Sequence, residues 1–280
     1  MRRSIIALAA TATLALAACS SDDSADEETT SGDNTASGEV VTLRVGASPV
    51  PHADILNFVN DNLAEDAGIE IEVIEYTDYV LPNSNLDSGD LDANFFQHVP
   101  YFESDSEANG YEFEHGEGIH IEPYAAYSET IDSLDDLPDG ATISIVNDPS
   151  NQARALWLLE DNGVITLDDS VDSPTIFDIV DNPKNVEFLE LEAPNLVRTL
   201  DEVDVAIING NFALEGGLVP AEDSIAIEDG EGNPYANILA WDPTSDKLEA
   251  ILTLDELLHS QEVADFITET YPNGEVIPAF

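Results

Sequence analysis

The chain has 280 residues, and its 59 acidic residues face only 7 basic ones, giving a formal net charge of −52. Such a charge repels nucleic acid and anionic lipid surfaces, which makes both poor partners. The acids are spread evenly along the chain, so they favour a solvated acidic surface, as in proteins exported into brine, over a site for one cationic partner. For the same reason, pairs of carboxylates carry no catalytic signal here.

The N-terminus has the layout of a secretory signal. Two arginines precede an uncharged, largely apolar run from Ser4 to Ala18, which ends in small residues before Cys19. This run is shorter than the roughly 20 residues that a spanning helix needs. The segment "LAAC" resembles the lipobox of bacterial-type lipoproteins, in which the cysteine is lipidated and becomes the first mature residue. We therefore expect a signal peptide over 1–18 and a lipid on Cys19.

Cys19 is the only cysteine, so no disulfide supports the fold and no thiol nucleophile is available. The following "SSDDSADEETTSGDNTASGE" has no large apolar side chain and cannot bury enough surface to fold. We expect residues 19–40 to form a disordered acidic tether.

The next segments alternate between strand and helix patterns. "VVTLRV" (40–45), "IEIEVIEY" (69–76) and "LDANFF" (91–96) are predicted strands, and apolar spacing predicts helices over 52–63 and 79–90. This alternation is typical of βαβ units and a mainly parallel sheet.

A second α/β unit is expected to begin between 128 and 141. "ATISIV" (141–146), "VEFLEL" (186–191), "VDVAIIN" (203–209) and "ANILAW" (236–241) are further predicted strands. After "NDP", Ser150 or Asn151 is a candidate cap of a helix that Gly163 closes. The last helical region is predicted over 248–271. Two such units indicate two lobes.

The few cations are informative in so acidic a chain. Arg154 follows the carboxyl end of a predicted strand, early in a helix, where ligands of open α/β sheets bind. A guanidinium there can hold a carboxylate in a bidentate manner, and the helix N-terminus adds positive potential. An ordinary Arg–Asp pair is the alternative interpretation.

Other candidates follow predicted strands in the same way. "NFFQHVPYF" (94–102) carries several rings, although Phe95 or Phe96 also suits a core and Tyr101 and Phe102 suit the core or lobe surface. Asn147, Asn209 and Asn211 offer both donors and acceptors, as a zwitterion requires. Aromatic walls, one arginine and several asparagines fit a small amino acid with an apolar side chain.

No enzyme motif is visible: the chain has no G-x-S-x-G elbow, P-loop, Rossmann glycine fingerprint or CxxC pair. We therefore expect no enzyme, no cofactor and no metal. A metal-binding receptor built on His98, His115 and His120 is the alternative, although their spacing matches no specific metal motif.

Long strings of the chain resemble the NlpA/MetQ lipoprotein family, the substrate-binding proteins of methionine ABC importers. They include "EYTDYVLPN", "GDLDANFFQHVPYF", "HIEPYAAYS", "IVNDPSNQARALWLLEDNG" and "IVDNPKNVEFLELEAPNLVRTLDEVDVAIINGNFA". The resemblance extends from Leu43 to the terminal "VIPAF". It implies an α/β fold of the two-lobed, type II periplasmic-binding-protein kind, with ligand in the cleft between lobes. We place lobe 1 at 41–126 plus 236–280 and lobe 2 at 127–235.

The resemblance also implies site residues. The methionine side chain is expected against Tyr79, Phe96, His98, His120 and Tyr124, and the zwitterion against Arg154, Asn147, Asn209 and Asn237. Asn237 comes from the resemblance alone. "GASPVPH" departs from the first loop of other members, so His52 either shapes ligand choice or only caps the following helix.

The function that the resemblance implies is a monomeric receptor, lipid-anchored on the extracytoplasmic side of the cell membrane, that delivers L- or D-methionine to an ABC permease and, through it, to its ATPase. A receptor for a methionine-containing dipeptide or another apolar amino acid stays open as an alternative.

Overall fold

The computed structural model describes residues 40–230 and 232–280. The predicted signal peptide, the lipidation site at Cys19 and nearly all of the acidic tether lie outside the described residues. Among the helices of the described part, none is both long and apolar enough to cross a bilayer.

The first lobe begins with a parallel arrangement of three strands. β1 (Val41–Ala47) lies between β2 (Ile69–Glu75) and β3 (Ala93–His98), and both neighbours run parallel to it. The strands are joined by a π-helical turn η1 (Pro49–Ala53) with α1 (Asp54–Asn62), and by α2 (Leu81–Asp87). Leu43, Val45, Ile55 and Val59 are fully buried in one core between sheet and helices, as the alternating and helical apolar spacings predict.

Antiparallel strands extend this sheet. β13 (Asn237–Trp241) pairs with β3, and on its other side it pairs with β4 (Glu114–His115) and β5 (His120–Ile121), which pairs with β14 (Ile277–Pro278). The prediction of a mainly parallel sheet is therefore wrong for the complete sheet, which is mixed. An antiparallel neighbour needs no crossover helix, and β13 follows a loop and not a helix. The alternation of helices and strands in the sequence therefore could not predict its antiparallel pairing.

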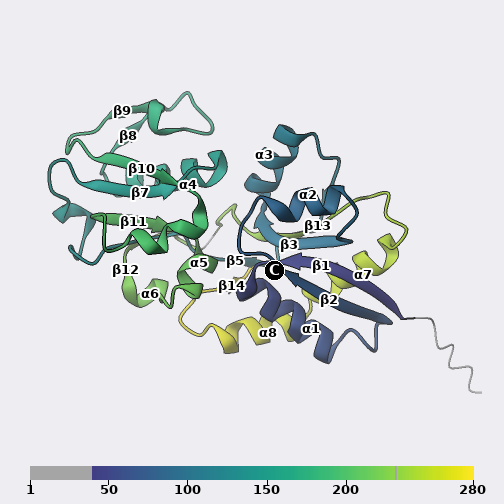
Figure 1. Ribbon diagram of the computed structural model, residues 1–280. Helices are drawn as coiled ribbons and strands as arrows, with labels where there is room; N and C mark the ends of the chain where they lie inside the picture. Colours follow the sequence, from purple (N-terminus) through teal and green to yellow (C-terminus); the bar gives the residue numbers. More distant parts are fainter. Residues whose placement is uncertain (1–39, 231) are drawn as a thin grey trace, which may run out of the picture. The chain divides into compact units, whose positions relative to one another are not determined.

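The second lobe repeats this plan. β7 (Thr142–Val146) lies between β10 (Glu187–Leu191) and β11 (Val205–Ile208) in parallel, and β6 (Ala125–Tyr127) and β12 (Ser224–Ile227) continue the sheet antiparallel, in the order β10-β7-β11-β6-β12. α4 (Pro149–Asp161) follows β7 and packs Leu156 and Leu159 against it. β8 (Thr166–Leu167) and β9 (Ile179–Asp181) form a separate two-stranded sheet, labelled above β10 in Figure 1.

The chain crosses between the two sheets twice. It leaves the first between β5 and β6, and it returns between β12 and β13. The lobe boundary expected after residue 126 falls inside β6, which spans Ala125–Tyr127. This strand pairs only with strands of the second sheet.

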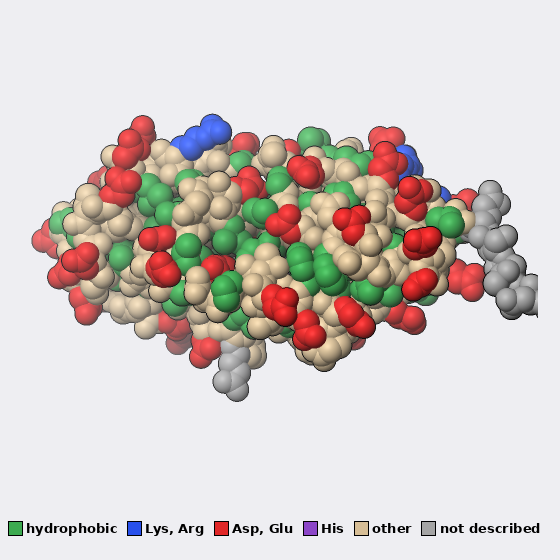
Figure 2. All heavy atoms as spheres, turned by 90° about the horizontal axis from the view of Figure 1, so that it is seen from below, with side chains coloured by type: hydrophobic (Ala, Val, Ile, Leu, Met, Phe, Trp, Pro, Cys, Tyr) green, Lys and Arg blue, Asp and Glu red, His purple; other side chains and the backbone are tan. Residues whose placement is uncertain are grey.

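The other helices complete the two lobes. They are α3 (Val99–Asn109), α5 (Gly210–Glu215), α6 (Pro220–Asp223), α7 (Leu248–Leu258), α8 (Gln261–Thr270) and the 3₁₀ turns η2 (Leu134–Asp136), η3 (Ile176–Asp178), η4 (Ala193–Asn195) and η5 (Val197–Thr199). The helical region predicted over 248–271 is thus two helices, because the Ser260 hydroxyl accepts from the Val263 amide and caps α8. Figure 2 shows acidic side chains spread over the visible face, with few cations among them.

Candidate functional site

A polar cavity lies where the two lobes meet. The first lobe contributes the end of β3, the start of β13 and the loop before α2. The second contributes the first turns of α4 and α5. The lining residues are His52, Tyr79, Phe96, Gln97, His98, Tyr101, Glu122, Asn151, Arg154, Asn209, Gly210, Asn211 and Asn237.

Three rings form one wall of the cavity. The centroids of Tyr79, Phe96 and Tyr101 lie 5.8 to 6.0 Å from one another, at distances typical of favourable aromatic pairs. Phe95 points to the opposite face of β3, as strand alternation requires, and is fully buried in the core of the first lobe. Phe102 belongs to a separate small apolar cluster.

His98 has a defined tautomer. It caps α3, and its Nδ1 accepts the backbone N–H of Tyr101 at 3.1 Å, so Nε2 carries the proton and donates to Oδ1 of Asn151 at 3.0 Å. Burial, with the charge of Arg154 nearby, lowers the pKa of His98 to about 3. The ring therefore faces the cavity as a neutral group.

Asn151 is the centre of a hydrogen-bond chain. Its Oδ1 also accepts from Nδ2 of Asn209 at 2.9 Å, and its own amide donates to Asp148. Asp148, and neither Ser150 nor Asn151, caps α4. The expected cap is wrong because Pro149 occupies the first helical position, so the cap must precede it.

Arg154 is both a lining residue and a member of a buried ion pair. Its Nε and Nη2 groups donate to the Glu228 carboxylate at 2.7 to 3.0 Å, and Nη2 also donates to the Glu122 carbonyl. The rings of Tyr124 and Tyr235 lie 4.9 and 4.2 Å from its guanidinium carbon. Burial alone would lower the pKa of Arg154, but Glu228 more than offsets this and the net direction is upward.

Two asparagines carry buried polar atoms that have no hydrogen-bond partner among the described residues. The hydroxyl of Tyr79 donates to Oδ1 of Asn211 at 2.6 Å, yet Nδ2 of Asn211 and Oδ1 of Asn209 have no protein partner. Buried amide groups are normally hydrogen-bonded. These two atoms belong to side chains that line the cavity, so a polar ligand is the natural partner for them.

The structure brings most of the predicted site residues together. Tyr79, Phe96, His98, Arg154, Asn209 and Asn237 line the cavity. His120 and Tyr124 are fully buried behind its wall. Asn147 is exposed and lines a neighbouring hollow with Tyr79 and Asp148.

Asn151 and Glu122 line the cavity but were not among the predicted ligand contacts. Asn151 shares a helix face with Arg154, three residues later, and this spacing was a usable signal. No sequence signal distinguished Glu122, because it is one of 59 acidic residues. The structure also does not bring His98, His115 and His120 together, since His115 is exposed on β4. Among the described residues, the possible metal-ligating group is instead His52, His120 and Glu122.

Two α/β lobes with mixed sheets, joined by two crossings and enclosing a polar cavity, define a two-lobed periplasmic substrate-binding protein. More specifically, residues 43–280 match the sequence model of the NlpA lipoprotein family, so the chain belongs to this family.

Named relatives and solved structures agree with this assignment. The chain is 40% identical, over 84% of its length and 86% of the relative's, to the methionine-binding lipoprotein MetQ of Bacillus subtilis. A lipoprotein structure from Actinomyces odontolyticus is 51% identical, with a TM-score of 0.84 over 86% of this chain and 100% of that one. A nutrient-binding protein from Burkholderia cenocepacia, solved bound to methionine, is 39% identical, with a TM-score of 0.81 over 85% of this chain and 100% of that one.

Proposed function

We propose that this protein is a methionine receptor, anchored by a lipid on Cys19 at the extracytoplasmic side of the cell membrane, which delivers its ligand to an ABC importer. The observation that carries the proposal is the composition of the cavity. It combines an aromatic wall, a buried arginine and amide atoms that lack protein partners. The relatives named for methionine support the same ligand.

The cavity offers different walls to the two ends of methionine. The thioether lies against Tyr79, Phe96 and Tyr101, because sulfur contacts with aromatic rings are favourable by about 0.3–1.5 kcal/mol. The carboxylate lies at Arg154, whose bonds to Glu228 use only the Nε and Nη2 groups, leaving the Nη1 edge for the ligand. Asn209, Asn211 and Asn237 complete the polar end.

Delivery depends on the two lobes closing around the ligand. The bonds from Tyr79 to Asn211 and from His98 to Asn151 run between the lobes, so they form when the lobes approach. The permease would recognise this closed arrangement, and its ATPase would drive transport. The receptor acts as a monomer and catalyses no reaction.

Ligand-induced thermal stabilisation tests the proposal. The purified protein is unfolded and refolded to remove carried-over ligand, then melted with L-methionine, D-methionine, glycyl-methionine or leucine. A ligand at 100 times its dissociation constant adds about 2.7 kcal/mol to stability, which raises Tm by several degrees. A clear rise with methionine supports the proposal. A rise only with the dipeptide or leucine replaces the ligand, and no rise with any of them contradicts the receptor function.

A further inference from the structure

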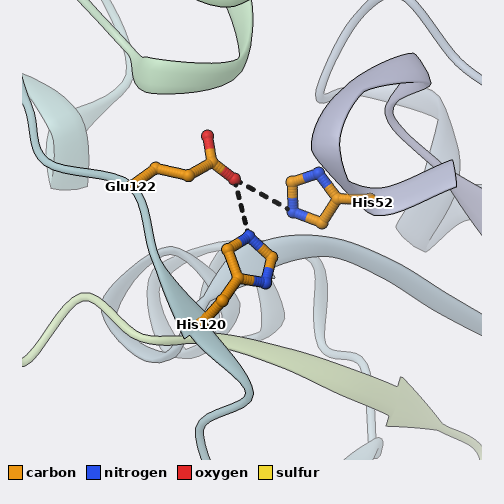
Figure 3. Close-up of side chains that lie close together, drawn as sticks. All are labelled: His52, His120 and Glu122. Atoms are coloured by element: carbon orange, nitrogen blue, oxygen red, sulfur yellow. Dashed lines mark hydrogen bonds and ion pairs between the residues drawn. The ribbon is translucent and has the colours of Figure 1, made fainter. Parts of the chain in front are cut away.

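Glu122 is a buried carboxylate of the cavity wall. It lies in the first crossing between the lobes and is 6% exposed. Its Oε1 atom is 2.8 Å from Nε2 of His120 and 3.4 Å from Nε2 of His52. Figure 3 shows both imidazoles directed at this one oxygen, while the second oxygen points away from them.

The two imidazoles face the carboxylate as neutral donors. Burial lowers the pKa of His52 to about 4 and that of His120 to about 3. Nε2 of His52 lies between two acceptors, Oε1 of Glu122 and Oδ1 of Asn237 at 3.1 Å, so it carries the proton. Nε2 of His120 is within hydrogen-bond distance of Glu122, while within residues 40–230 and 232–280 its Nδ1 has no partner. Neither histidine therefore neutralises the charge of Glu122.

The nearby arginine does not neutralise it either. Arg154 donates to the backbone carbonyl of Glu122, and its side-chain charge is paired with Glu228. Burial raises the pKa of Glu122, and His52, the backbone N–H of Asn211 and Arg154 offset this only in part, so Glu122 is a buried carboxyl group without a cationic partner of its own. A buried carboxylate without a cationic partner is costly, and a ligand that carries a cation would supply that partner.

The first residue of α5, Gly210, leaves room for the Glu122 side chain. A Cβ on Gly210 would lie 2.6 Å from Cβ of Glu122 and 3.1 Å from its Oε2, so a larger residue would displace the side chain. The backbone N–H of Asn211 hydrogen-bonds to Glu122, and the unpartnered side-chain amide atoms of Asn209 and Asn211 belong to the same cavity wall. The carboxylate and the amides thus form one polar corner of the cavity.

We propose that Glu122 binds the ammonium group of the ligand, and that His52 and His120 are positioning residues that hold its carboxylate toward the cavity. This rests on the proposed function, because the ligand must carry an ammonium group. Together with Arg154 it gives each charge of a zwitterion its own partner, Glu122 for the ammonium and Arg154 for the carboxylate.

A metal ion is the competing occupant of this corner, because the donor atoms of His52, His120 and Glu122 all lie within 4.8 Å of one another. The surroundings of His120 argue against a metal ion. A metal-ligating histidine almost always donates its other ring N–H to an acceptor, and Nδ1 of His120 is buried without one.

Calorimetric titration with two ligands tests the proposal. The ligands are L-methionine and 4-(methylsulfanyl)butanoate, which lacks only the amino group. The wild type should bind methionine about 100-fold more tightly, the usual order for one buried charge partner. In Glu122→Gln this preference should fall below about 10-fold, through weaker binding of methionine alone. Glu215→Gln is the matched control, because this exposed acid does not line the cavity, and it should keep the full preference.

The histidines are tested by the same preference, which a merely structural role would not change selectively. His120→Leu removes a donor and should reduce the preference, whereas His120→Gln keeps a side-chain N–H and should restore it. Melts without ligand establish that each variant folds. If Glu122→Gln does not fold, the two His120 variants decide the question.

Three results would overturn the proposal. An unchanged preference in Glu122→Gln would show that the ammonium lies elsewhere, and equal loss of both ligands in His120→Leu and His120→Gln would show a structural role only. A rise in Tm with zinc that His120→Leu abolishes would assign the corner to a metal. A wild type that binds no methionine contradicts the proposed function instead, and is distinguishable from all three.

Discussion

Nε2 of His98, at the end of a strand of the first lobe, lies 3.0 Å from Oδ1 of Asn151, in the first turn of a helix of the second lobe. The same oxygen accepts from Asn209. One amide group therefore joins both lobes and two separate segments of the second lobe at the cavity wall.

Asn151→Ala is expected to weaken both the fold and binding. It leaves the donors of His98 and Asn209 buried without this acceptor, which costs about 2 kcal/mol and lowers Tm by about 4–8 °C. Urea unfolding and methionine titration measure the two effects. Asn147→Ala is the control: Asn147 is exposed four residues earlier, and its loss should change stability by less than about 0.5 kcal/mol. Equal effects of both substitutions would contradict the central position of Asn151.

Arg154→Met should abolish methionine binding and destabilise the free protein. It leaves Glu228, which is 14% exposed, without its cation, and breaking a buried pair in this way costs about 3–5 kcal/mol. The double variant Arg154→Met/Glu228→Gln removes the orphaned charge and should regain much of the stability, but no binding. Melting curves and titrations separate these effects. Recovery of binding in the double variant would show that Arg154 serves only to neutralise Glu228.

The aromatic wall should favour sulfur over a plain alkyl chain. We expect wild-type protein to bind methionine about 2- to 10-fold more tightly than norleucine, from the usual strength of sulfur–aromatic contacts. Phe96→Leu should reduce this ratio toward 1 by calorimetry. Phe102→Leu is the control, because Phe102 packs in a cluster that does not line the cavity. A ratio that is insensitive to Phe96 would place the thioether elsewhere.

Stability should fall as pH decreases from about 6.5 to 4. Burial lowers the pKa of His52, His98 and His120 in the folded protein to about 4, about 3 and about 3. Below pH 6.5 the unfolded chain takes up protons at these positions while the folded chain does not, so each histidine reduces stability by up to about 1.4 kcal/mol per pH unit. Above pH 6.5 these histidines are largely neutral in both the folded and the unfolded chain, so their protonation no longer reduces stability.

Urea unfolding at several pH values measures this slope. His98→Gln should make it shallower, whereas the exposed His115→Gln should leave it unchanged. A slope that His98→Gln leaves unchanged would mean that this ring takes up its proton in the folded state.

Salt should stabilise the protein, because its net charge of −52 opposes the compact state through self-repulsion. Screening lengths fall from about 10 Å at 0.1 M to about 3 Å at 1 M, so most of the rise in Tm should occur below 1 M potassium chloride. Melts over a salt series, with sucrose as a non-ionic control, provide the measurement. A rise that continues linearly to 3 M would indicate exclusion of salt from the surface instead of screening.

Local sequence patterns were sufficient to predict the central strands and to single out Arg154 as a candidate site residue. β1 and β7 are β-branched runs flanked by turns, and Arg154 was conspicuous as one of 7 basic residues. Choosing between Asn147 and Asn151 required the phase of α4 relative to its sheet, which depends on where Asp148 caps the helix.

Other features depend on contacts between distant segments. The role of Glu122 is set by two histidines and by Gly210, and no local pattern distinguishes it from other acids. β13 joins the first sheet only because the chain returns there after completing the second lobe.

That return has a consequence for how the protein reaches its folded state. The second sheet comes from the unbroken segment 125–227, whereas the first lacks β13, an interior strand, until residue 241 has been added. Because domains generally fold as units during synthesis or emergence of the chain, the lobe that starts the protein must finish folding last. A chain truncated before residue 237 would therefore hold one complete lobe beside an open sheet edge at β3, where polypeptides associate most readily.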